Sequence, residues 1–264
     1  IVFKGEKATK PADPTKSGNT FMGWTLGGAA YDFTAAVTGN ITLKAKWEKD
    51  AEIWVGGVGM VSGDYLANGE ATTTTSKPSG GYAYYKDGVL TLHDYSYTGA
   101  GYNVRSGYNA LVYIKKHLEL VLEGSSSLKY SGADSVSGLC VNGYVTVKGS
   151  GSLDLTITAY GMDTYKPIIE GGTLTITTAG NGITCDDMEV NGGSVTVNAQ
   201  GKGVYCNYSN TIKAGTLKVT AQGRAIDVFE GGVNIDGGKV EVESTGNDGI
   251  NVESSVHITD GSLW

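Results

Sequence analysis

Oxygen-bearing side chains recur at the bends of a repeated sequence pattern, and they are the residues best suited to hold a cation. The set comprises Asp186, Asp187, Asp227, Asp248 and Asn251. Carboxylate and amide oxygens are the ligands that Ca²⁺ takes in proteins, so calcium is the cofactor that this set would bind. Asp and Asn side chains also cap turns in solvent, and that alternative stays open because no EF-hand or nonapeptide calcium motif is present.

Tyrosines form the second group of candidate residues, and the chain has 16 of them. Tyr205 and Tyr208 fall on an expected outer face, while Tyr160 and Tyr165 fall in an expected loop. The amphipathic Tyr ring suits stacking against a sugar. Tyr is also common on ordinary β surfaces because its β propensity is high. We expect carbohydrate contacts at these four side chains, with ordinary surface tyrosines as the alternative.

The residue types needed for catalysis on polysaccharides do not gather in the sequence. A hydrolase needs two suitably spaced carboxylates, and a lyase needs a strong base such as Arg or Lys beside a stabilised carboxylate. The arginines are Arg105 and Arg224, which stand far apart in the chain. The histidines, which are His93, His117 and His257, share no phase of the repeat. We therefore predict no catalytic residues and no enzyme.

Two of the three cysteines occupy the same phase of the repeat. Cys185 and Cys206 are expected to point inward from neighbouring coils, where they would form either a redox pair or part of an apolar row continued by Val228 and Val252. The apolar row is favoured, because free Cys behaves as a small hydrophobe. Cys140 falls at an outward position and has no partner in the pattern.

An internal repeat must position all of these residues. Apolar strand starts at Ile183, Val204, Ile226 and Ile250 follow one another at intervals of 21, 22 and 24 residues. Each is followed by a second alternating strand, and Gly stands at the bends. Two short strands in a period of about 22 residues predict a right-handed parallel β-helix, whose coils stack about 4.8 Å apart.

The segment 111–122 precedes the clearest repeats, and either a helix or a strand could accommodate it. Val112 and Ile114, and then Leu118, Leu120 and Leu122, alternate with other residues. Because an alternation of two is the period of a strand, we expect strands here.

The region before this segment is expected to close the open end of the β-helix. Asp87-Gly88 separates two alternating runs over 82–93, which is a strong hairpin signal. Residues 71–81 are rich in Thr, Ser and Gly and are expected to form a loop. A cap is needed because an uncovered terminal strand would pair with other chains. The predicted divisions are 1–49, 50–110 and 111–264.

The N-terminal fifty residues carry three spaced aromatic motifs. They are Pro-Thr-Lys-Ser-Gly-Asn-Thr-Phe-Met-Gly-Trp over 14–24, Tyr-Asp-Phe over 31–33, and Val-Thr-Gly-Asn-Ile-Thr-Leu-Lys-Ala-Lys-Trp over 37–47. Together they resemble the Listeria–Bacteroides repeat, the internalin-type B-repeat. The resemblance implies a small β-grasp-like module in a secreted or wall-attached protein, often one of several in tandem. Strands are expected over 20–24 and 41–47, and Trp24 is expected to pack in the core rather than bind a ligand.

The remainder of the chain carries shorter motifs. The opening Ile-Trp-Val-Gly-Gly-Val over 53–58, the strand Gly-Val-Leu-Thr-Leu over 88–92 and the Gly-Ile bends resemble those of bacterial surface β-helices that bind carbohydrate. The resemblance covers about 52–264. It implies a glycan ligand, and some members of the group bind acidic plant polysaccharides with calcium.

Charge and hydropathy exclude two classes of partner. The formal charge of −7 and the pI of 5.0 argue against nucleic acid, whose phosphates require Lys and Arg. No apolar run of about 18 residues is present, so we expect no membrane insertion.

We expect an all-β, non-catalytic protein of the bacterial cell surface or cell wall, in which a β-grasp-like module precedes a β-helix. Its outer face is predicted to bind a polysaccharide or a host-surface ligand. A structural adhesin stalk is the first alternative, and a degenerate polysaccharide lyase is the second. The chain is expected to be part of a longer multi-module protein, since it starts and stops within motifs.

Overall fold

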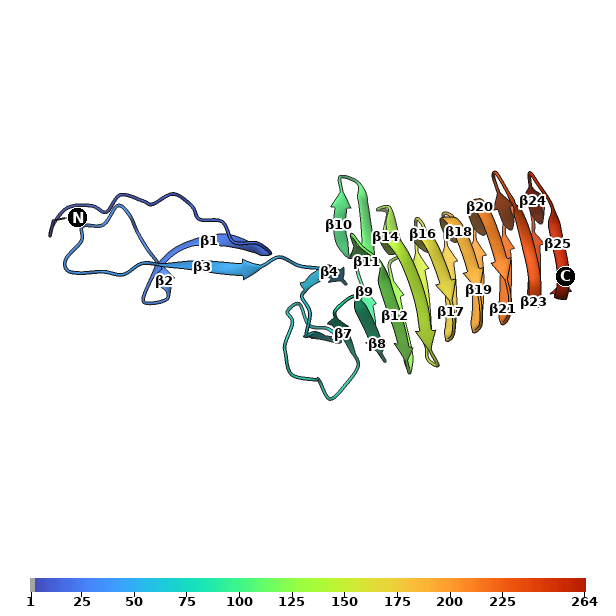
Figure 1. Cartoon of the computed structure of the whole chain (residues 1–264), viewed down its shortest axis with the longest axis horizontal. Helices are drawn as coiled ribbons and strands as arrows, with labels where there is room; N and C mark the ends of the chain where they lie inside the picture. Colours follow the sequence, from blue (N-terminus) through green and yellow to red (C-terminus); the bar gives the residue numbers. More distant parts are fainter. Residues whose placement is uncertain (1–2) are drawn as a thin grey trace. The chain divides into compact units, whose positions relative to one another are not determined.

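The computed structural model describes residues 3–264, and every regular element within that range is a β-strand. The expected N-terminal module begins at residue 1, so its first two residues lie outside the described residues. The chain divides into one compact unit that ends at Ala51 and a larger one over Glu52–Trp264. The larger unit is a β-solenoid (Figure 1). The all-β expectation is therefore confirmed.

The N-terminal unit is a three-stranded antiparallel sheet in the order β2-β1-β3. Its strands are β1 (Asn19–Leu26), β2 (Ala29–Ala30) and β3 (Lys44–Lys49). Phe21 packs edge-on against Trp24 and Trp47, each with ring centroids 5.5 Å away, and all three residues are half-buried rather than enclosed in a core. The expected strand over 41–47 begins only at Lys44, because β1 ends just after the residue that pairs with Lys44.

The solenoid is entered through antiparallel hairpins. The strands are β4 (Ile53–Val55), β5 (Val58–Met60), β6 (Asp64–Ala67), β7 (Tyr82–Lys86), β8 (Val89–His93), β9 (Ser96–Thr98) and β10 (Tyr102–Arg105). The β7–β8 hairpin turns at Asp87 and Gly88, with φ of 49° and 91°. Positive φ at both central residues matches the type I′ turn that an Asp-Gly pair favours, so the predicted hairpin is confirmed.

Parallel coils follow, with two strand segments in most turns. The strands are β11 (Tyr108–Ile114), β12 (Leu118–Glu123), β13 (Ser125–Lys129), β14 (Val136–Gly149), β15 (Ser152–Ile157), β16 (Met162–Ile169), β17 (Thr173–Thr178), β18 (Ile183–Val190), β19 (Ser194–Ala199), β20 (Val204–Ile212), β21 (Thr216–Ala221), β22 (Ile226–Val228), β23 (Gly232–Ser244), β24 (Ile250–Val252) and β25 (Val256–Leu263). The alternating residues of segment 111–122 thus lie in strands, as predicted, with a bend over 115–117.

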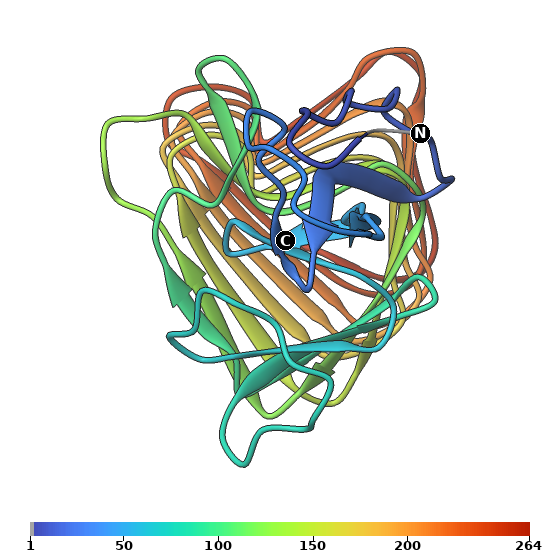
Figure 2. The same cartoon turned by 90° about the vertical axis from the view of Figure 1, so that its left-hand side faces the viewer.

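The register between coils confirms the repeat. Met162 pairs with Ile183, Ile183 with Val204, and Val204 with Ile226, which gives offsets of 21, 21 and 22 residues. The solenoid has about 7 turns, and viewed from its end the successive coils nearly superimpose (Figure 2). Because each coil pairs with the one before it, residues at one phase of the repeat form straight rows across the coils.

The first coil does not end in an open sheet edge. β4 pairs antiparallel with β11, while β8 and β9 pair in parallel with β12 and β13. The parallel pairing therefore begins at β8, ahead of residue 111. The three-part division of the chain stays a prediction.

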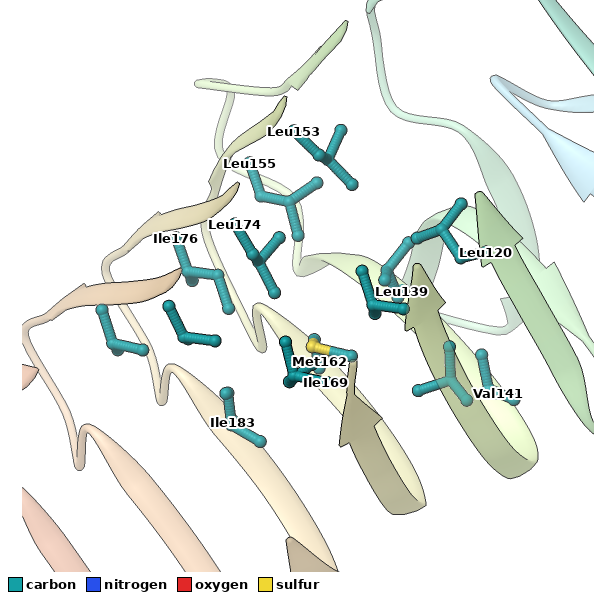
Figure 3. Close-up of a cluster of buried hydrophobic side chains, with 14 of the residues drawn as sticks. Leu120, Leu139, Val141, Leu153, Leu155, Met162, Ile169, Leu174, Ile176 and Ile183 are labelled. Atoms are coloured by element: carbon teal, nitrogen blue, oxygen red, sulfur yellow. The ribbon is translucent and has the colours of Figure 1, made fainter. Parts of the chain in front are cut away.

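Apolar side chains fill the interior of the coils. Leu139, Met162 and Ile183 stack from successive first strands and meet Leu155 and Ile176 from the second strands (Figure 3). All five are buried. At roughly 25 cal/mol per Å² of apolar surface removed from water, such continuous rows dominate the stability of the solenoid.

The cysteines follow the favoured interpretation. Cys185 pairs in register with Cys206, and Cys206 with Val228, so the thiols belong to one inward apolar row. Their Sγ atoms lie 3.1 Å apart and both thiols are free. Cys140 points outward, as expected, but it is buried beneath an aromatic cluster that includes Tyr108 and Tyr113.

Candidate functional site

Two rows of side chains lie next to one another on the outside of the solenoid. The corner row holds the residue before each bend into a first strand, namely Tyr160, Asn181, Lys202, Arg224 and Asp248. The outer strand row holds the outward residues that follow, namely Asp163, Thr184, Tyr205, Asp227 and Asn251. The parallel register fixes both rows, so side chains distant in sequence become neighbours about 4.8 Å apart.

A cavity of about 480 Å³ opens where the two rows approach the last coils. We call it the outer hollow, and its principal lining residues are Lys202, Tyr205, Arg224, Asp227, Phe229 and Asn251. They come from β20, β22, β24, the bends that precede β20 and β22, and, for Phe229, the bend that follows β22. Phe229 is 61% exposed, so an apolar ring stands open to solvent at its edge.

Asp227 is the polar centre of the outer hollow. Its residue is only 3% exposed. Its carboxylate accepts from Lys202 Nζ at 2.6 Å, from Arg224 at 3.3 Å and from Asn251 Nδ2 at 2.7 Å. Burial alone would raise the pKa of Asp227, but these hydrogen bonds and the two positive charges outweigh it and lower the pKa below its ordinary value. The carboxylate is therefore held ionised.

The two cations of the outer hollow are held in place by further contacts. Lys202 Nζ lies 4.1 Å from the centre of the Tyr205 ring, within cation–π range. Arg224 Nε lies 3.4 Å from an oxygen of Asp248 in the next coil. These contacts fix the directions in which the cationic groups face, so the hollow is organised before any ligand arrives.

This arrangement has the chemical elements of sugar recognition. The ring of Phe229 and the ring of Tyr205 offer apolar faces against which the C–H groups of a pyranose can pack. The carboxylate of Asp227 accepts hydrogen bonds from hydroxyl groups, and the Lys202 and Arg224 groups donate them. A site with an apolar face and a few convergent polar groups is the usual form of a small-ligand pocket.

Comparison with protein families agrees with this geometry. Residues 28–225, and again residues 168–264, match the model of carbohydrate-binding domain-containing proteins. The chain belongs to this family. Residues 1–46 match the Listeria–Bacteroides repeat domain, which is typical of bacterial surface proteins. No curated protein and no solved structure gives a significant match.

The four predicted tyrosines of this carbohydrate-binding domain do not form one cluster. Tyr205 lines the outer hollow, and Tyr208 is exposed further along the same strand. Tyr160 stands in the corner row two coils earlier and packs near Tyr108, with ring centroids 6.3 Å apart. Tyr165 is exposed on β16, so the loop expected at this residue is a strand. Only Tyr205 is brought together with the charged residues of the hollow.

The five predicted cation ligands fall into two groups in the carbohydrate-binding domain. Asp227 and Asp248 both contact Arg224, and Asn251 donates to Asp227. Asp186 and Asp187 lie on β18, where they accept from Asn207 at 2.7 Å and from Ser209 at 2.5 Å. Within residues 3–264, no three His, Cys, Asp or Glu side chains converge as metal ligands. Calcium binding stays a prediction.

Lys202 and Phe229 were not among the candidates from the sequence, although the repeat contains signals for both. Lys202 stands one coil before Arg224 at the same phase, which places two cations on one side of Asp227. Phe229 directly follows the inward Val228, so the alternation turns it outward. Aligning the repeats by phase would have found them.

No helix in the part of the chain that the structure describes is long and apolar enough to cross a membrane.

Proposed function

We propose that the solenoid binds a polysaccharide segment at the outer hollow without transforming it. The observation that carries the proposal is the placement of Tyr205 and Phe229 beside the fixed charges of Lys202, Arg224 and Asp227. Membership of the carbohydrate-binding family supports the ligand class. Tyr208, exposed on the same strand as Tyr205, would extend the apolar contact beyond the hollow.

The state of Asp227 argues against a role as the general acid of a hydrolase. A glycosidase needs a carboxylic acid whose pKa is raised, so that it can protonate the leaving oxygen. The pKa of Asp227 is lowered by Lys202, Asn251 and Arg224, against the opposing effect of burial. An anion held in this way suits hydrogen bonding to sugar hydroxyls. Lys202 and Arg224 beside this carboxylate are the residue types that a lyase would use, so the binding test also monitors unsaturated products.

The repeat that precedes the solenoid supports a place on the cell surface. Listeria–Bacteroides repeats are typical of bacterial surface proteins and occur in multi-module chains. We propose that the N-terminal unit is one spacer in such a chain and that it presents the solenoid to extracellular glycans.

Isothermal titration calorimetry of the full chain tests the proposal against soluble polysaccharides. The panel contains neutral chains and polygalacturonate, each with calcium and with chelator. Tyr205→Ala and Phe229→Ala should each weaken binding by roughly 2- to 10-fold, because a stacked ring contributes about 0.5–1.5 kcal/mol. Tyr144→Ala is the control, since Tyr144 is exposed and outside the hollow.

The outcomes separate the three readings of the chain. Binding that is weakened by the two variants but not by the control supports the outer hollow. Loss of binding with chelator would indicate that a calcium ion at the predicted ligands takes part in binding. Absence of binding throughout leaves the adhesin stalk, and the release of unsaturated products would show a lyase.

A further inference from the structure

A second cavity, of about 410 Å³, lies at the C-terminal ends of the second strands and crosses several coils. We call it the amide groove. Its floor is formed by the last inward residues of β15, β17, β19 and β21, namely Ile157, Thr178, Ala199 and Ala221. These strands lie side by side along the solenoid, and Figure 1 labels β17, β19 and β21.

The groove exists because the side chains of its floor are small. Elsewhere the inward rows carry Leu, Ile and Val, which fill the interior. Thr178, Ala199 and Ala221 are small, so the surface sinks between the residues on either side. Thr178 uses its hydroxyl to donate to the carbonyl of Ala159 at 2.6 Å, which leaves mostly methyl groups on the floor.

Uncharged side chains, all but Ala179 polar, form both walls. One wall is the outward row Thr156, Thr177, Asn198 and Thr220, whose members pair in register from coil to coil. The other wall is Ala179, Gln200, Gln222 and Thr245. Asn198, Gln200 and Gln222 are exposed, so their amide groups face solvent and can both donate and accept hydrogen bonds.

The groove repeats itself along its length. One step from coil to coil is about 4.8 Å, so the four steps from Thr156 to Thr245 span roughly 19 Å. That step is close to the advance of one pyranose unit in an extended β-1,4-linked glycan. A chain lying along the solenoid axis would therefore have a wall hydroxyl or amide group within reach of each sugar.

The lining of the groove carries no charge. None of its lining residues in the described part of the chain is charged. Glu243 follows Thr220 in the same outward row, so the nearest charge at that end is negative. Lys129 precedes Thr156 at the other end of that row. Lys202 follows the wall residue Gln200 by two positions, so cations flank the groove without lining it. The uncharged lining suits a neutral chain, which needs no ionic partner.

Peptide binding by strand addition has no basis at this place. β17, β19 and β21 each pair in parallel on both sides, so their backbone N–H and C=O groups are already used. Recognition must therefore come from the side chains of the walls, which are the hydroxyl and amide groups that neutral sugars require.

We infer that the amide groove is a second glycan-binding site, which takes an extended neutral β-1,4-linked chain aligned with the solenoid axis. It shares no residue with the outer hollow, so it does not depend on the function proposed for that site. The outer hollow is charged and would hold a short segment. The groove is uncharged, and its affinity would depend on the length of the glycan.

Calorimetry with cello- and manno-oligosaccharides of increasing length tests the inference on the full chain. Affinity should rise from the disaccharide to about the tetra- or pentasaccharide and then level off, since the groove offers about four steps. It should be insensitive to salt. Asn198→Ala and Gln200→Ala should each weaken the binding of the longer oligosaccharides by roughly fivefold, from the loss of one hydrogen bond.

Matched variants separate the two sites. Thr173→Ala removes an exposed hydroxyl from β17 outside the groove and should leave the affinity unchanged, as should Tyr205→Ala. The side-chain amide NMR signals of Gln200 and Gln222 should shift on adding the longest oligosaccharide of the series. No binding of any neutral oligosaccharide, or binding weakened by Tyr205→Ala but not by the groove variants, would overturn the inference. Either result would leave binding of other glycans at the outer hollow intact.

Discussion

Asp227 shows how one residue can be buried on a surface that is otherwise open. It sits at an outward position of a strand, yet Lys202, Arg224 and Asn251 cover it from neighbouring coils and bends. A carboxylate in that position is stable only while its partners are present, because an unpaired buried charge is costly. Its role is therefore to orient the cations as much as to contact a ligand.

Replacing this carboxylate should affect both stability and binding. Asp227→Ala is expected to lower the free energy of unfolding by about 1–3 kcal/mol, through the loss of its charge-assisted hydrogen bonds. It should also weaken glycan binding at the outer hollow, since Lys202 and Arg224 lose their fixed orientation. Urea denaturation followed by circular dichroism measures the first effect. Asp236→Ala, at an exposed position, is the control and should change stability little.

The thiols offer a second test at the residue scale. Burial raises the pKa of Cys140 to about 11, and hydrogen bonding with Cys206 together with burial raises that of Cys185. Near pH 8 the thiolate fraction of Cys140 should be roughly 100-fold below that of an ordinary Cys. We expect iodoacetamide to label all three cysteines slowly in the native chain and fully after denaturation, as read by mass spectrometry. Rapid native labelling of Cys140 would contradict its burial.

At the scale of elements, the bends impose the strictest requirement on the sequence. Five glycines with positive φ precede successive second strands or lie within the corresponding bends, namely Gly172, Gly193, Gly215, Gly238 and Gly261. At Gly215 the φ is +79°, and a Cβ would stand 2.5 Å from the carbonyl oxygen of Gly193 in the coil below. The bends therefore stack so closely that only hydrogen fits between them.

Gly215→Ala should consequently destabilise the solenoid. Strain at positive φ and the clash with a neighbouring backbone should together cost more than 1 kcal/mol, and about 2–3 kcal/mol if the coil cannot relax. Thermal unfolding measures the loss. Gly80→Ala is a matched control, because a Cβ there meets nothing within 4 Å. Equal unfolding temperatures for the two variants would show that the stacked bends relax to accommodate a methyl group.

The sequence predicted those elements whose signals are local and repeated. The inward positions of Ile183, Cys185 and their equivalents follow from alternation and period alone, and the hairpin at Asp87-Gly88 follows from its turn residues. The start of β3 at Lys44 rather than at residue 41 could not be predicted, because it depends on where the partner strand β1 stops.

The candidate site was predictable only in part, for a physical reason. Phase places Tyr205 and Asp227 in one outward row, but rotamers decide that Lys202 reaches across the coil to Asp227. The amide groove depends on the summed volumes of small floor residues such as Ala199, which no single motif records. The calcium and tyrosine assignments stay predictions.

At the scale of the whole molecule, paired carboxylates link stability to pH. The pKa of Glu52 is lowered by its hydrogen bond with Lys116, and that of Glu189 by its hydrogen bond with Lys166. The pKa of Asp227 is lowered as well, despite the opposing effect of burial. A carboxylate with a lowered pKa in the folded state stabilises the fold above its unfolded pKa, and this contribution is lost as pH falls through the folded value.

The unfolding temperature should therefore depend on pH in a defined direction. Unfolded Asp and Glu titrate near about 3.9 and 4.3, so the midpoint should stay nearly constant from neutral pH to about 5 and fall below about 4. Circular dichroism melts across this range measure it. Glu189→Gln should reduce the slope on the acidic side, and an unchanged slope would argue against a contribution from the Lys166 pair.

The in-register stacking of coils also bears on how such a chain can change over generations. Since each coil pairs only with its immediate neighbours, duplicating a segment such as 183–203 would insert one further turn whose inner and outer residues already match those on both sides. The amide groove would then lengthen by one step, whereas the outer hollow near the last coils would keep its composition. Unequal crossing-over between repeats could thus set the length of glycan that is recognised, with no point mutation in the binding residues.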